Sequence, residues 1–284
     1  MSLRVNVELT NPGQFFACCG LLELADRLAP GAEGWFEGGE FRIECDPAKL
    51  ATIKQLLQAL IDCPLTNTMS ATQLDRLRQL TALGTAGRSK AAEEEMKALT
   101  KLRRTEPIVL GSPFNLHIDW FLDDRAGGNR FKTWAGQQGV LDIASAMKRA
   151  IQPTPGKVNP AEACLRASVL GGGLPFYFDS DIGAQVTAID VGFSADPLKI
   201  SSAVRPYIEL LAFVGLQRFR PCKSETENRY SYAIWGEPLS PILAAAVCGC
   251  AVEVFATAQY EFSTQFRNDY YKSFLPSQPV RGDR

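Results

Sequence analysis

The sequence predicts an α+β fold, with mixed, mainly antiparallel sheets and packed helices. Residues 3–9 alternate apolar and polar side chains as a strand does, while residues 15–28 and 50–61 repeat apolar side chains at helical spacing. Gly38-Gly39, within Trp35–Cys45, is a turn signal that joins neighbouring strands into an antiparallel hairpin. The chain has 284 residues, 46% of them hydrophobic, which is enough for a substantial core.

The first half of the chain begins with a strand followed by a well-marked helix. Asn11 is a favourable N-cap, Pro12 suits the first helical position, and Gln14 stands where a capping box requires it. Asp46-Pro47 is expected to start a second helix after the hairpin. Strand, helix, hairpin and helix make up most of a βαββαβ unit, so a ferredoxin-like N-terminal unit is expected.

The predicted organisation is an N-terminal α/β region, residues 1–152, and a C-terminal α/β region, residues 153–284, with one continuous domain as the alternative. A proline-broken stretch, residues 152–160, favours the division. Residues 66–105 are polar and charged, with breaks at Gly84 and Gly87. They are predicted to be a protruding excursion, helical or partly disordered, that becomes ordered on binding nucleic acid or a partner.

The remaining elements follow from local patterns of apolar residues and turn signals. They are two strands or an edge within residues 108–122, a helix at 140–151, strands near 176–178 and 185–191, a buried helix at 204–216, a strand at 229–235, a helix at 242–255, and a polar tail.

Charge is unevenly distributed along a chain whose net charge is only −1. Residues 71–105 carry a net charge of +4, residues 125–150 also +4, and residues 199–232 +3. Such tracts can follow a phosphate backbone even in a nearly neutral protein, although each alone is also typical of a solvated surface.

The cysteines indicate a reducing compartment. None of the eight forms a C-x-x-C pair, and the chain has a single histidine, so no zinc site is expected. Free thiols suit the cytoplasm. The start of the chain lacks the apolar core of a signal peptide, and the most apolar run, Ile242–Val252, is too short to span a bilayer. A cytoplasmic protein without membrane contact is therefore predicted.

Two acidic groups are the candidates for catalysis. His117 and Asp119 would share one face of a strand, next to Asp123 and Asp124, and a His–Asp pair can hold a metal or transfer protons. Asp179 and Asp181, with Asp190, could bind magnesium. Both groups are more typical of turns. The residues therefore predict no enzyme, no cofactor and no small-molecule substrate, with a metal-dependent nuclease as the alternative.

Two stretches with similar composition are the candidate nucleic-acid surface. In the first, Arg130 and Lys132 can pair with phosphates, Trp134 can stack on a base, and Gln137 can hydrogen-bond to a sugar or base edge. The second follows the buried helix and carries three cations, Arg218, Arg220 and Lys223. If the two stretches converge, they form one basic groove with an aromatic platform.

Five further segments share a family pattern and are spread in order over most of the chain: residues 11–23, 118–121, 131–138, 190–194 and 209–221. These segments resemble the third of the Csb families of CRISPR-associated proteins, which belong to subtype I-G (formerly I-U). The resemblance implies a type I, crRNA-guided surveillance complex, in which this chain is a nonenzymatic subunit that binds guide RNA or target DNA and neighbouring Cas subunits. It also implies a place as the large subunit or as a RAMP-type, ferredoxin-like subunit. A scaffold that contacts only protein is a further alternative.

Overall fold

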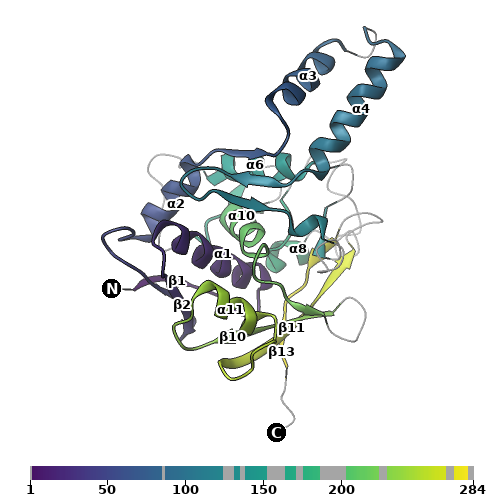
Figure 1. The fold of residues 1–284 in the computed structure, drawn as a ribbon. Coiled ribbons are helices and arrows are strands. Elements are labelled where there is room, and N and C mark those ends of the chain that lie inside the picture. The colour runs from purple at the N-terminus through teal and green to yellow at the C-terminus, as the bar shows by residue number, and fades with distance from the viewer. Residues whose placement is uncertain are drawn as a thin grey trace.

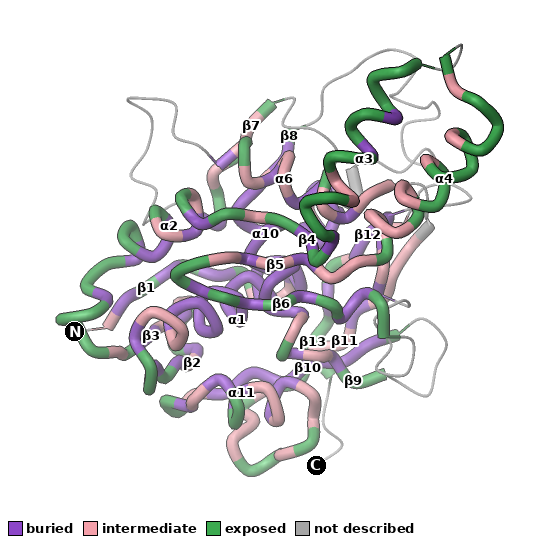
Figure 2. The backbone as a smooth tube through the Cα atoms, turned by 45° about the horizontal axis from the view of Figure 1, so that its top comes forward, coloured by how far each residue is buried: buried purple, intermediate pink, exposed green. Residues whose placement is uncertain are grey.

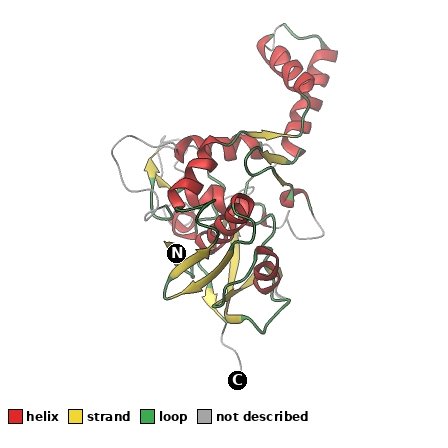
Figure 3. Ribbon diagram, turned by 60° about the vertical axis from the view of Figure 1, so that its left-hand side comes forward, coloured by secondary structure: helices red, strands yellow, loops and turns green. Residues whose placement is uncertain are grey.

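The computed structural model describes residues 2–84, 87–123, 131–134, 138–151, 164–170, 175–185, 203–223, 229–266 and 272–280. Within these ranges the strands form four sheets, all with antiparallel pairing, and helices pack against them (Figure 1, Figure 3). The predicted α+β class is confirmed.

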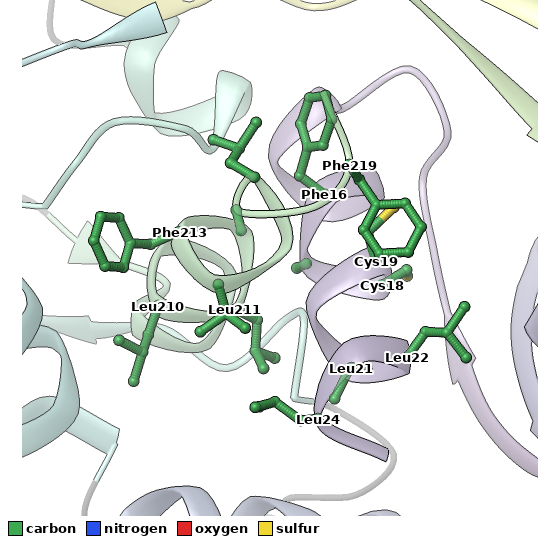
Figure 4. Packing of buried hydrophobic residues seen from close by; sticks show 14 of the residues in the cluster. Phe16, Cys18, Cys19, Leu21, Leu22, Leu24, Leu210, Leu211, Phe213 and Phe219 are labelled. Atoms are coloured by element: carbon green, nitrogen blue, oxygen red, sulfur yellow. The ribbon is translucent and has the colours of Figure 1, made fainter. Parts of the chain in front are cut away.

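Two helices that are distant in the sequence form the centre of the molecule: α1 (Pro12–Leu28) and α10 (Pro206–Gly215). Their apolar side chains pack together (Figure 4). The backbones approach closely because each helix has a glycine at the crossing. A Cβ on Gly20 would collide with the carbonyl oxygen of Leu211, and a Cβ on Gly215 with that of Phe16. Every residue of α10 is buried as a result.

The start of α1 follows the sequence prediction closely. Asn11 is the N-cap, and its side-chain oxygen accepts a hydrogen bond from the backbone N–H of Gln14 at 3.3 Å. The side chain of Gln14 departs from the capping box, because it accepts from the N–H of Glu8 at 2.9 Å instead. This bond ties the helix to the end of the first strand.

The N-terminal sheet has the order β1-β3-β2 and covers α1 on one side. Gly38 and Gly39 form the predicted turn with positive φ angles of 61° and 80°. A ferredoxin-like unit is not confirmed, because the next strand, β4, pairs with β5 in a separate sheet. The second helix begins at the N-cap Thr52 rather than at Asp46. The bounds are β1 (Leu3–Asn6), β2 (Glu33–Glu37), β3 (Glu40–Glu44) and α2 (Ile53–Asp62).

Residues 66–105 project from the body as two antiparallel helices (Figure 1). We call α3 (Ala71–Ala82) and α4 (Lys90–Thr105) the arm. Both helices are capped by serine side chains, and together they make up most of the described part of the excursion. The arm leaves the body from a three-stranded sheet, β4 (Leu65–Asn67), β5 (Ile108–Leu110) and β6 (Leu116–Ile118).

The C-terminal part forms the largest sheet, in the order β12-β11-β10-β9 with β13 also on β11. The predicted strand at 229–235 is confirmed, but two other predictions are wrong. The apolar helix ends at Cys248, and the expected polar tail is mostly strand. The bounds are β9 (Cys222–Lys223), β10 (Arg229–Trp235), α11 (Pro241–Cys248), β11 (Ala256–Phe266), β12 (Lys272–Phe274) and β13 (Gln278–Pro279).

Shorter elements complete the body: η1 (Trp120–Leu122), α6 (Val140–Ile151), β7 (Val169–Leu170), α8 (Ser180–Gln185) and β8 (Ala203–Val204). Helix α6 has the predicted bounds. Residues 176–178 are not a strand, since Tyr177 has a φ of 65°. Most of the strand predicted at 185–191 lies outside the described residues.

One hydrophobic core runs through both predicted regions, from Leu3 to Phe274. Figure 2 shows buried residues concentrated in the body and a mostly exposed arm. The predicted boundary at 152/153 lies outside the described residues. None of the described helices is long and apolar enough to cross a bilayer.

Candidate nucleic-acid interface

Trp134 is in the core and not on a surface platform. Its side chain is only 5% exposed, and its ring packs against Trp120, Phe121 and Phe176 at centroid distances of 6.0, 6.1 and 5.1 Å. A base can stack only on a ring with an open face, so this geometry does not support the predicted stacking role. The aromatic character of the stretch serves packing.

Lys132 is half-buried beside this ring, with its Nζ 5.6 Å from the ring centroid of Trp134. Burial lowers the pKa of the Lys132 ammonium below its ordinary value. The backbone of Thr133 accepts a hydrogen bond from the N–H of Lys272 at 2.9 Å, which fixes the stretch to β12. Arg130 and Gln137, the other predicted contacts of this stretch, lie outside the described residues.

Arg218 is paired within the protein, although its side chain is 37% exposed. Its guanidinium pairs with Glu23 of α1, which is only 3% exposed and also pairs with Arg27 at 2.9 Å. Burial alone would raise the pKa of Glu23, but hydrogen bonds from Arg218 and Arg27 hold it below its ordinary value. This three-residue cluster joins α1 to the end of α10.

Arg220 is likewise occupied by the fold, whereas Lys223 is exposed on β9. The guanidinium of Arg220 donates to the carbonyl oxygens of Trp120 at 3.5 Å and Gln217 at 3.4 Å. Burial lowers its pKa, against the opposing effect of nearby Asp123 and Asp119. The two predicted stretches therefore do meet around Trp120, but through buried aromatic rings and carbonyl groups. Lys223 differs from the other described cations of the predicted groove, because it is exposed and forms no ion pair with a described residue.

Gln217 is a residue whose role the sequence did not reveal. Its side-chain oxygen accepts from the backbone N–H groups of Asp119 at 2.9 Å and Trp120 at 3.1 Å, and its amide donates to the Asp119 carboxylate at 2.9 Å. Asp119 is thus part of the start of η1. His117 is exposed on β6 as the strand alternation predicts, while Asp124 lies outside the described residues.

The second acidic group is organised around an arginine. Nη1 of Arg205 lies 2.7 Å from Asp181 and 3.3 Å from Asp179, and Asn11 donates to Asp179 at 2.7 Å. The guanidinium supplies the positive charge that a magnesium ion would bring. Asp190 lies outside the described residues, and no three His, Cys, Asp or Glu side chains within the described ranges are placed to hold a metal together.

Glu209 anchors the chain beside this group and was also not identified from the sequence. Its carboxylate accepts from the backbone N–H groups of Phe178 at 3.2 Å and Asp179 at 3.1 Å. Burial raises the pKa of Glu209 to about 8. The side chain is only 1% exposed, so the carboxyl group holds residues 178–179 in place inside the core.

All eight cysteines are free thiols, as the sequence predicts. Burial raises the pKa of Cys18 and Cys19 in α1, which keeps both thiols protonated and apolar. Cys222 on β9 is exposed.

The arm presents its cations differently from the body. Four are in ion pairs, namely Arg76 with Glu95, Arg78 with Asp75, Lys97 with Glu93, and Arg103 with Asp142. Arg88 donates to the backbone carbonyls of Leu80 and Thr81. Lys90, Lys101 and Arg104 form no ion pair with any described residue. The arm is therefore the part of the described chain where unpaired positive charge projects from the body.

The segments that carry the family resemblance lie mainly in the core. Residues 11–23 form the first part of α1, and residues 209–221 form most of α10 and the turn after it. Trp120, from a third of these segments, donates from Nε1 to the carbonyl oxygen of Phe213 at 3.0 Å. Residues 190–194 lie outside the described ranges. No protein-family model and no curated protein matches the chain.

Proposed function

We propose that the protein is a nonenzymatic, cytoplasmic subunit of a crRNA-guided, type I-G surveillance complex, which binds guide RNA or target DNA and neighbouring Cas subunits. The type I-G complex is inferred from the family resemblance, and the contact with nucleic acid is inferred from the arm. The observation that carries the binding role is the projection of the arm from the body: residues 71–105, which contain it, have a net charge of +4 in a chain whose total is −1.

A positively charged projection favours binding to a polyanion. Electrostatic attraction to phosphates depends on local rather than total charge, and it acts without regard to base sequence. This fits a guided complex, in which base pairing provides the sequence specificity. The arm also contributes little to the core, since α4 has no buried residue and α3 buries only Leu77 and Leu80.

The arm can be deleted and β4 joined directly to β5 to test this proposal. Its ends lie side by side, because the N–H of Thr68 donates to the carbonyl oxygen of Pro107 at 3.2 Å and β4 pairs with β5. Replacing residues 68–107 with Asn-Gly would close β4 and β5 into a short hairpin. Unchanged thermal melting of the body would show that the deletion is tolerated.

The assay is fluorescence anisotropy with a labelled single-stranded RNA of mixed sequence, across a salt series. We expect full-length protein to bind with a clear salt dependence and the arm deletion to lose most of this binding. Equal affinity of the two proteins would refute the proposed role of the arm. RNA or DNA cleavage that requires magnesium or manganese would refute the nonenzymatic proposal.

A protein-only scaffold is the second candidate, favoured by the outer face of α11. Ile242 is 71% exposed and Leu243 is 47% exposed, and large apolar side chains exposed together mark contact surfaces. Co-purification of the other subunits from host cells after complete nuclease digestion, together with no binding of RNA or DNA, would support this alternative.

A further inference from the structure

We infer that Lys97, Lys101 and Arg104 form a phosphate-binding row on the outer face of α4. This inference rests on the proposed function, because it names the part of the arm that contacts nucleic acid. The three residues are spaced four and three apart, which places them on one face of the helix, within two turns.

The direction of this face follows from two ion pairs on other sides of α4. Glu95 points toward α3, because Arg76 of α3 contacts its carboxylate at 2.7 Å. Arg103 points toward α6, where it pairs with Asp142. At 3.6 residues per turn, the row lies about 120–180° around the helix from Glu95. The row therefore faces away from α3, on the solvent side of the arm.

The charges of the row are available to a ligand. Lys101 and Arg104 have no carboxylate partner among the described residues. Lys97 pairs with Glu93 at 2.8 Å, but the two side chains are 68% and 48% exposed, so the pair is weak and easily exchanged for a phosphate. Lys90 is in register with the row, but Glu93 and Glu94 follow it, so the purely basic part begins at Lys97.

The spacing of the row suits the backbone of a nucleic acid. The Cα atoms of its residues rise along the helix by about 6 Å and then about 4.5 Å. Long, flexible Lys and Arg side chains on such a line can reach neighbouring phosphates of one strand. Contacts of this kind set position and affinity but do not read bases.

A membrane surface is the less favourable partner for this face. Helices that lie on lipid place large apolar residues beside their cations. The large apolar residues of α4 are Met96, Leu99 and Leu102, and all three are half-buried. The helical repeat puts Leu99 and Leu102 on the side away from the row and Met96 between the two sides. The exposed side of α4 thus offers charge without an apolar anchor.

The test compares two double variants of the full-length protein with the same loss of charge. Lys97→Gln/Lys101→Gln removes two members of the row, and Lys49→Gln/Lys54→Gln removes two exposed lysines near and in α2. The ligand is the labelled single-stranded RNA, titrated over a salt series. We expect the row variant to weaken binding and to lower the salt slope by about one for each lost contact. The α2 variant should bind like the unmodified protein.

Each of the other outcomes would refute the proposal that these three residues form a phosphate-binding row. Equal weakening by both variants would mean that only net charge matters. No weakening by the row variant, when the arm deletion still abolishes binding, would place the contact elsewhere on the arm and leave the proposed function standing. If the arm deletion also binds normally, the proposed function fails together with the row. Tighter row-dependent binding to phosphatidylserine vesicles than to RNA would assign the row to a membrane.

Discussion

The buried carboxyl group of Glu209 should make the stability of the folded protein depend on pH, and the size of this effect can be worked out from the structure. Its pKa is raised by burial to about 8, from an ordinary value of 4.5. Between these values the folded protein holds a proton that the unfolded chain releases. The stability from this group is therefore fully present below about pH 4.5 and is lost as the pH rises through about 8.

The magnitude follows from the same linkage. Between about pH 4.5 and 8, the free energy of unfolding falls by about 1.4 kcal/mol for each pH unit. The total loss over this range is at most roughly 5 kcal/mol. Glu209→Gln has nearly the same shape and cannot ionise, so it removes this contribution. Asp179, whose pKa burial also raises, remains in both proteins and adds a pH dependence of the same sign to each.

The assay is urea unfolding of the protein and of Glu209→Gln at a series of pH values from about 5 to 8. We expect the unmodified protein to lose stability more steeply than the variant as the pH rises. Parallel pH profiles would show that Glu209 does not hold a proton in the folded state. A profile that rises with pH only in the unmodified protein would reverse the sign and refute the reasoning.

Three further predictions concern the packing and the thiols. Trp134→Ala should cost about 3–5 kcal/mol of stability because it empties a core site, and a variant that melts normally but binds RNA poorly would contradict this. Arg218→Ala should cost about 2 kcal/mol of stability, because it leaves buried Glu23 with one partner. Lys223→Ala should change the stability by no more than about 0.5 kcal/mol. Equal melting temperatures of the two variants would refute the structural role of Arg218. Native protein should react with a thiol reagent first at Cys222 and show eight thiols when unfolded, and a titre short by pairs would contradict it.

The parts of the fold that the sequence predicted well are those set by local chemistry. Asn11 and Pro12 define the start of α1 because a cap and a fixed φ act within a few residues. Gly38-Gly39 defines its turn for the same reason. The expected helix start at Asp46 was wrong, because Asp46 instead organises a short turn and Thr52 provides the cap.

The candidate site was predicted less well because burial depends on distant partners. The composition around Trp134 is compatible with a binding surface, and only the positions of Trp120 and Phe176 show that the ring is enclosed. In the same way, Arg218 looks like a free cation until Glu23 is placed beside it. The arm was the exception, since its polarity and glycine breaks are properties of the segment itself.

The glycine contact between α1 and α10 also has a consequence for synthesis of the chain. Helix α1 is translated first, with fourteen residues that end up buried, yet the helix that covers them begins at Pro206. Until that point has left the ribosome, the face of α1 that packs against α10 has no permanent cover. The nascent chain should therefore depend on a chaperone, and a ribosome stalled before residue 206 should carry an aggregation-prone intermediate.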